Sequence, residues 1–152
     1  MSQEPLHIAI YFLHYLAIFA VVSGIVAAHL MLHKNIVRAD LRRVWPVQVI
    51  VLGGFALAFV TGLLQWFAGE WPAEKYTKNG IFHLKVLLVV VSAALAVPPT
   101  LYLKKHKDGE PNDKISTSTP TMMCLRGQLV LVVLVIPLLA LLMARFVGFY
   151  GE

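Results

Sequence analysis

Residues 5–33 read PLHIAIYFLHYLAIFAVVSGIVAAHLMLH, a stretch that contains no Asp, Glu, Lys or Arg. Three more runs of this kind follow at residues 44–69, 86–103 and 127–144. A helix needs about 20 mainly apolar residues to cross the hydrocarbon core of a bilayer. The last two runs reach that length when one lysine and one arginine are included. The pattern therefore predicts an all-α protein, an integral membrane four-helix bundle.

The expected helices span about residues 5–33, 45–68, 80–103 and 123–147, in a single transmembrane domain over residues 1–152. Four spans leave no length for a separate soluble domain. Asn79 is expected to cap the third helix, and Pro98-Pro99 to bend it near its far end. The single cysteine, Cys124, excludes an internal disulfide. The first run lacks a basic leader, so no cleaved signal peptide is expected.

The distribution of positive charge predicts the orientation of the bundle. Nine of the 13 Lys and Arg residues lie in the connections between the first and second and between the third and fourth helices. The positive-inside rule places these two connections in the cytoplasm and both termini outside, an N-out/C-out topology in the cell inner membrane. The same rule accounts for the net charge of +5 without nucleic acid as a partner.

Small residues recur every fourth position in the first two helices. The first helix carries Ala20, Gly24 and Ala28, and the second carries Gly54, Ala58 and Gly62. This spacing lets two backbones approach closely in lipid. It predicts tight packing of the two helices, and it is compatible with room for a flat cofactor beside Gly24 and Gly62.

His14 is the leading candidate for a cofactor ligand. It lies about 9 Å below the outer interface at a rise of 1.5 Å per residue, and an ionisable residue at this depth is a functional candidate. The small residues Ala17, Gly24 and Ala28 share its side of the helix, as axial ligation of a haem would require. The alternative interpretation is a buried histidine bonded to a neighbouring hydroxyl or carbonyl group.

Two cations share this outer layer of the membrane. Lys85 lies one turn into the third helix, and Arg145 lies in the outer part of the fourth. No carboxylate lies inside the four apolar runs to neutralise them, although Glu70 and Glu74 could reach in from a connection. Either the two cations snorkel to lipid phosphates, or they bind an anionic ligand such as the propionates of a tetrapyrrole. His83 points to nearly the opposite face from Lys85.

A second candidate metal site lies at the inner end of the first helix. His29 and His33 are four residues apart, a spacing that suits a metal. Met31 and Cys124 are expected at the same level, and soft ligands of this kind favour Cu(I). Copper is therefore the alternative to haem as a cofactor.

Several stretches resemble a family of small bacterial membrane proteins of unknown function. They are RADLRR (38–43), TGLLQWF (61–67), EKYTKNGIFHLK (74–85), SAALAVPPTLYLKK (92–105) and LLALLMAR (138–145). The similarity covers nearly the whole chain. It implies a four-helix membrane fold and no particular activity.

A more distant similarity suggests a chemistry. A histidine early in the first helix, Thr-Gly in the second and a lysine at the start of the third are similar to the HemJ-type protoporphyrinogen oxidase and to CopD-type membrane domains. The resemblance implies that His14 is a haem ligand and that Lys85 is needed for activity. The oxidases have a Leu-Pro-Arg segment after the first helix, whereas residues 28–37 here read AHLMLHKNIV.

These observations together predict a membrane protein that holds b-type haem or a related tetrapyrrole near its outer face. The expected role is electron transfer or tetrapyrrole oxidation, with a membrane quinone as a possible electron acceptor. The alternatives are a copper-handling protein and an ancillary membrane protein without a cofactor. Whether the protein is an enzyme, and whether it forms a homo-oligomer, are left open.

Overall fold

The computed structural model describes residues 4–69 and 72–145. In these residues, four helical spans are long and apolar enough to cross a membrane. The first is α1 (Glu4–Met31) and the second is α2 (Arg38–Ala68). The third is α4 (Gly80–Leu95) continued by α5 (Val97–His106). The fourth is α6 (Thr119–Val130), a π-helical segment η1 (Leu131–Val135) and α7 (Ile136–Ala144). The prediction of an all-α four-helix membrane protein is confirmed.

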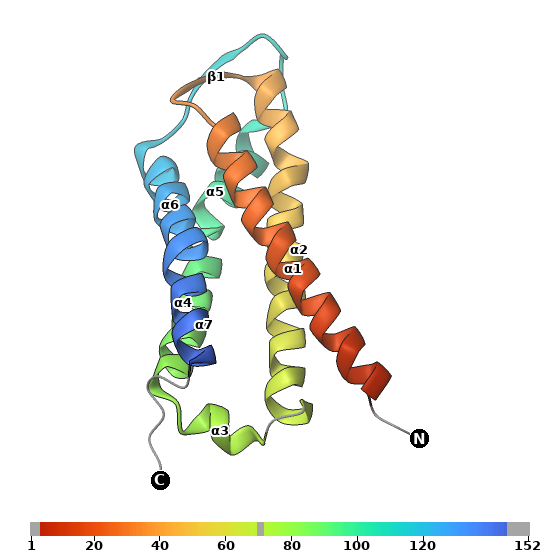
Figure 1. Cartoon of the computed structure of the whole chain (residues 1–152). Helices are drawn as coiled ribbons and strands as arrows, with labels where there is room; N and C mark the ends of the chain where they lie inside the picture. Colours follow the sequence, from red (N-terminus) through yellow and green to blue (C-terminus); the bar gives the residue numbers. More distant parts are fainter. Residues whose placement is uncertain (1–3, 70–71, 146–152) are drawn as a thin grey trace.

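The spans are arranged as two pairs (Figure 1). α1 packs along α2, and α4 packs against α7 and α6. The short helix α3 (Ala73–Thr77) connects the pairs at one end, which we call the α3 end. The strands β1 (Asn35–Val37) and β2 (Lys114–Ser116) form a two-stranded ribbon at the opposite end, the ribbon end. Contacts of α1 with α6 and of α2 with α5 join the two pairs of helices. The two pairs lie further apart at the α3 end (Figure 1).

Glycines make the contact between α1 and α2 close. A Cβ atom at Gly24 would lie 2.5 Å from Cγ2 of Val51, and one at Gly54 would lie 2.7 Å from Cγ2 of Val21. The residues around this contact, including Val21, Ile25, Val51 and Phe55, form a buried cluster. The stripes of small residues therefore bring these two helices together as the spacing predicted.

The third span is broken at Ala96, where the sequence predicted a bend from Pro98-Pro99. A proline has no N–H and cannot donate to the carbonyl four residues earlier. Two buried glutamines donate to carbonyls around the break. Gln128 Nε2 donates to the Ser92 carbonyl (3.0 Å), and Gln48 Nε2 donates to the Ala96 carbonyl (3.2 Å). Side chains from α2 and α6 thus support the interrupted backbone.

The fourth span also departs from a regular α-helix, which the sequence did not predict. The segment Leu131–Val135 is π-helical, and the N–H of Ile136 bonds to the Leu131 carbonyl five residues earlier. Pro137 follows directly, and its missing N–H cannot bond to Val133. The shift in hydrogen bonding is how the helix continues past the proline. The predicted end of this helix at Val147 lies outside the described residues.

The helices at the ribbon end begin and end at residues other than those predicted. α1 ends at Met31, before the expected residue 33, and α2 begins at Arg38 instead of near residue 45. The uncharged run marks where α2 enters the hydrocarbon, but Leu41 and Val44 are fully buried and keep the preceding turns helical. α6 likewise starts at Thr119, four residues before the expected start, with Pro120 in its first turn.

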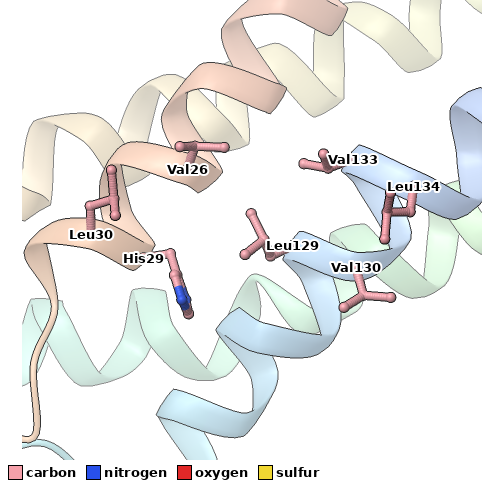
Figure 2. Close-up of a pocket in the computed structure, with 7 residues that line it drawn as sticks. All are labelled: Val26, His29, Leu30, Leu129, Val130, Val133 and Leu134. Atoms are coloured by element: carbon pink, nitrogen blue, oxygen red, sulfur yellow. The ribbon is translucent and has the colours of Figure 1, made fainter.

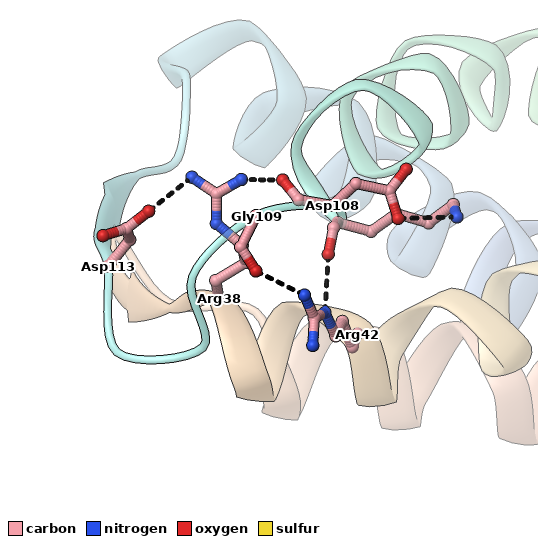
Figure 3. A network of polar contacts seen from close by, with 6 residues as sticks. Arg38, Arg42, Asp108, Gly109 and Asp113 are labelled. Carbon is pink, nitrogen blue, oxygen red and sulfur yellow. Dashed lines mark hydrogen bonds and ion pairs between the residues drawn. The ribbon is translucent and has the colours of Figure 1, made fainter.

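The two polar connections at this end pair with each other, a feature that the sequence did not predict. β1 and β2 pair antiparallel with Ile36 opposite Ile115, and Thr117 bonds to the backbone of His33 and Lys34. Figure 3 shows how the arginines of α2 hold the second connection. Arg38 pairs with Asp113 at 2.9 Å and also donates to the Asp108 carbonyl. Arg42 donates to the carbonyls of Lys107 (2.8 Å) and Gly109 (2.5 Å).

Candidate functional site

His14 is the centre of the candidate site. It lies in α1 near the α3 end, and its Nδ1 is 2.8 Å from the hydroxyl of Thr61 in α2. Thr61 is buried, and its hydroxyl donates to the Leu57 carbonyl at 2.7 Å. The alternative interpretation of His14, a buried histidine bonded to a neighbouring hydroxyl group, expected a contact of this kind. The contact engages only one of the two ring nitrogens.

The hydrogen-bond chain favours one tautomer of His14. A hydroxyl has one hydrogen, and Thr61 gives it to Leu57, so Thr61 accepts from His14 Nδ1–H. In the neutral ring the other nitrogen, Nε2, then has a free lone pair. A second hydrogen bond that fixes the tautomer and ring orientation in this way is typical of histidines that ligate metals.

Gly62 leaves one side of the imidazole open to close approach. A Cβ atom at this position would lie 3.4 Å from Cε1 of His14, with no other side chain nearby except the rest of the same ring. Gly62 therefore contacts the candidate ligand itself. Gly24, in contrast, lies ten residues along α1, where it packs against Val51. The two glycines that the sequence grouped as cofactor-binding have different neighbours.

Lys85 lies in α4, one turn after the helix begins. Its ammonium is 5.6 Å from the centre of the Phe82 ring and 4.0 Å from Sδ of Met143 in α7. Neither neighbour is an anion. Glu74, one of the carboxylates expected to reach Lys85, is paired with Lys78 at 2.5 Å, and that hydrogen bond lowers the pKa of Glu74. Glu70 lies outside the described residues.

The remaining candidates of this layer are not part of the same contact. Arg145 is exposed at the end of α7 and forms no ion pair with any described residue. His83 is exposed, and its Nε2 is 2.8 Å from the Thr77 carbonyl. Among the described residues, no hydrogen bond or ion pair joins any two of His14, Lys85, His83 and Arg145.

His29 and His33 lie at different hollows. Figure 2 shows the hollow that His29 lines. Because α1 ends at Met31, the regular helical spacing between them is lost. His29 lines an apolar hollow of about 350 Å³ between α1 and the fourth span, with Val26, Leu129 and Val133 among its neighbours. His33 lies at a different hollow beside Asp40 and Arg43. The described residues contain no group of three His, Cys, Asp or Glu side chains that could hold a metal ion.

Uncharged polar residues of the spans were missed by a search for charged residues and histidines. Gln48, Gln128, Gln65 and Thr61 all lie inside apolar runs, and Gln48, Gln128 and Thr61 are buried. Their signal was available, because a glutamine inside a membrane span must find hydrogen-bond partners in the protein. Such residues deserved the same weight as the histidines.

The fold and site define an integral membrane protein with four apolar spans and a polar cluster at the α3 end. Residues 6–148 match the model of a family described as "Predicted membrane protein (DUF2214)", and the chain belongs to this family. The predicted membership in a membrane protein family of unknown function is thereby confirmed. Comparison with curated proteins and with solved structures gave no match.

Proposed function

We propose that this protein binds a b-type haem or a related tetrapyrrole at its α3 end, with His14 Nε2 as an axial ligand. The observation that carries the proposal is the hydrogen bond between His14 Nδ1 and the Thr61 hydroxyl, which itself bonds to the Leu57 carbonyl. This arrangement favours a proton on Nδ1 and a lone pair on Nε2. An imidazole held in this way presents a lone pair in a fixed direction, as a metal ligand must.

The surrounding residues fit such a group. Gly62 adds no side chain beside the imidazole of His14. Lys85 provides a positive charge that no described carboxylate neutralises, and a tetrapyrrole carries anionic propionates. Arg145, at the exposed end of α7, would contribute at most at the edge of the site.

The tetrapyrrole would supply one-electron chemistry, and the protein would orient it and set its potential. The distant similarity to HemJ-type oxidases favours electron transfer or tetrapyrrole oxidation, with a membrane quinone as the electron acceptor. Lys85 would then hold an anionic group of the cofactor or substrate. We further propose that the α3 end faces outward from the cell inner membrane, because the ribbon end carries most of the basic residues.

An absorption spectrum of the purified protein, oxidised and then reduced, tests the proposal. We expect a Soret band, with sharpened α and β bands on reduction. His14→Ala should lose most of this absorbance, and Thr61→Val should weaken haem binding about 10- to 100-fold, the usual effect of removing a group that orients a metal ligand.

The matched controls are histidines outside the cluster. His83→Ala and His29→Ala should keep the spectrum, since neither ring contacts Thr61. Colourless wild-type protein, even after expression with added haem precursor, would remove the haem proposal. Coloured protein that His14→Ala leaves unchanged would keep haem and reject His14 as its ligand.

A further inference from the structure

Two buried hydrogen-bond donors near the end of α2 have no acceptor among the residues that the structure describes. Gln65 Nε2 and Trp66 Nε1, both near the end of α2, are buried atoms without a hydrogen-bond partner. A buried donor left unpaired costs about 1–3 kcal/mol. A pair of adjacent unpaired donors therefore indicates that something else supplies the acceptors.

Gln65 shares a helix face with Thr61, and Trp66 shares the neighbour Phe82 with Lys85. Gln65 follows Thr61 by one helical turn, so the two lie on the same face of α2. The ring of Trp66 packs edge-on against Phe82, with 4.9 Å between the ring centres. The Lys85 ammonium lies 5.6 Å from the centre of the same Phe82 ring. Phe82 is thus flanked by Trp66 and Lys85, and it connects the end of α2 to α4.

The three side chains of this group can all donate hydrogen bonds. The amide of Gln65, the indole of Trp66 and the ammonium of Lys85 all donate hydrogen bonds, and the last also carries a positive charge. The nearest described carboxylate on the connecting helix, that of Glu74, is engaged by Lys78. The group that complements three donors and one positive charge is an anion with at least two acceptor oxygens.

We propose that Gln65, Trp66 and Lys85 form a binding site for a carboxylate of the ligand. This inference rests on the proposed function for the identity of that ligand, in which the carboxylate is a propionate of the tetrapyrrole. A lipid phosphate offers similar oxygens and would compete for the same donors. Gln65 and Trp66 would select ligands with a free acid group, whereas His14 would select ligands with a metal.

Three ligands separate the two selections: haem, haem dimethyl ester, whose propionates are blocked, and metal-free protoporphyrin IX. Their dissociation constants are measured by absorbance and fluorescence titration of the full chain in dodecyl maltoside, with and without added phosphatidylglycerol. We expect the wild type to bind haem at least about tenfold more tightly than the dimethyl ester, as hydrogen bonds to a charged group predict. Trp66→Phe, Gln65→Met and Lys85→Met should each reduce this preference and leave the affinity for the ester nearly unchanged.

Thermal stability without ligand distinguishes binding residues from structural ones. Because the side-chain donors of Gln65 and Trp66 have no acceptor among the described residues, Gln65→Met and Trp66→Phe should not lower the melting temperature of the ligand-free protein. Trp45→Phe, at the ribbon end, and Lys78→Met, in the exposed pair with Glu74, are the controls and should keep the full preference for haem.

Each outcome decides between the two proposals. Equal affinity for haem and its dimethyl ester would overturn the carboxylate site and leave the haem proposal standing. Protoporphyrin IX bound through Gln65, Trp66 and Lys85, with no effect of His14→Ala on haem, would support the carboxylate site and reject the axial ligand. Loss of the preference only when phosphatidylglycerol is added would show that a lipid phosphate occupies the site. No binding of any tetrapyrrole would overturn both.

Discussion

Gly54→Ala tests the close packing of α1 on α2 with the smallest possible change. The added methyl group would lie 2.7 Å from Cγ2 of Val21 and 3.2 Å from the carbonyl oxygen of Ala17. A backbone oxygen cannot turn aside as a side chain can, so the helices must separate slightly. Overpacking of this kind costs about 1–3 kcal/mol. Replacing glycine by alanine in a helix returns up to about 1 kcal/mol.

The neighbouring residue provides the control. A Cβ atom at Gly53 would have no side chain or backbone of another segment within 4 Å. Gly53→Ala therefore receives the same gain in helix propensity without the clash, and the difference between the two variants isolates the steric term of about 1–3 kcal/mol. Reversible unfolding in mixed micelles, with increasing denaturing detergent, measures both. Equal stability of the two variants would refute the packing of α1 on α2 through Gly54.

Two further predictions concern the break in the third span and the orientation of the bundle. Gln128→Leu should lower the free energy of unfolding by about 1 kcal/mol, because the Ser92 carbonyl loses its bond to Gln128 Nε2. The same unfolding assay measures this loss, and unchanged stability would contradict this account. Reporter fusions after Asp108 and after Glu152 should give cytoplasmic and outer signals respectively, and the opposite pair of signals would reject the N-out/C-out topology.

Most of the fold follows from one property of the sequence, the length of its uncharged runs. That property predicts how many spans there are because a bilayer penalises charge wherever it lies. It says little about the ends of the helices, since Leu41 and Val44 extend α2 beyond the membrane by packing against α1 and α5 at the ribbon end. The uncharged runs did not predict the pairing of β1 with β2 either. It depends on contacts between residues about 80 positions apart in the chain, such as Asn35 with Ser116.

The candidate site was only partly predictable for a related reason. His14 and Lys85 could be found one at a time, because each is ionisable and lies at membrane depth. Their neighbours Thr61, Gln65 and Trp66 have no such signal alone. Thr61 matters through the direction of its hydroxyl bond, and the other two matter because a donor atom is buried without an acceptor. Both facts depend on how α1, α2 and α4 meet.

The two ends of the bundle differ in what their cations contact. At the ribbon end, Arg38 and Arg42 donate to a carboxylate and to backbone carbonyls of the second connection (Figure 3), so these cations hold the connections together. At the α3 end, Lys85 faces an aromatic ring and a sulfur atom, and two neighbouring donors are unpaired. Proteins retain unfavourable arrangements of this kind mainly where a ligand completes them. The imbalance therefore argues that the α3 end binds a ligand with anionic oxygens, and that the ribbon end maintains the fold around it.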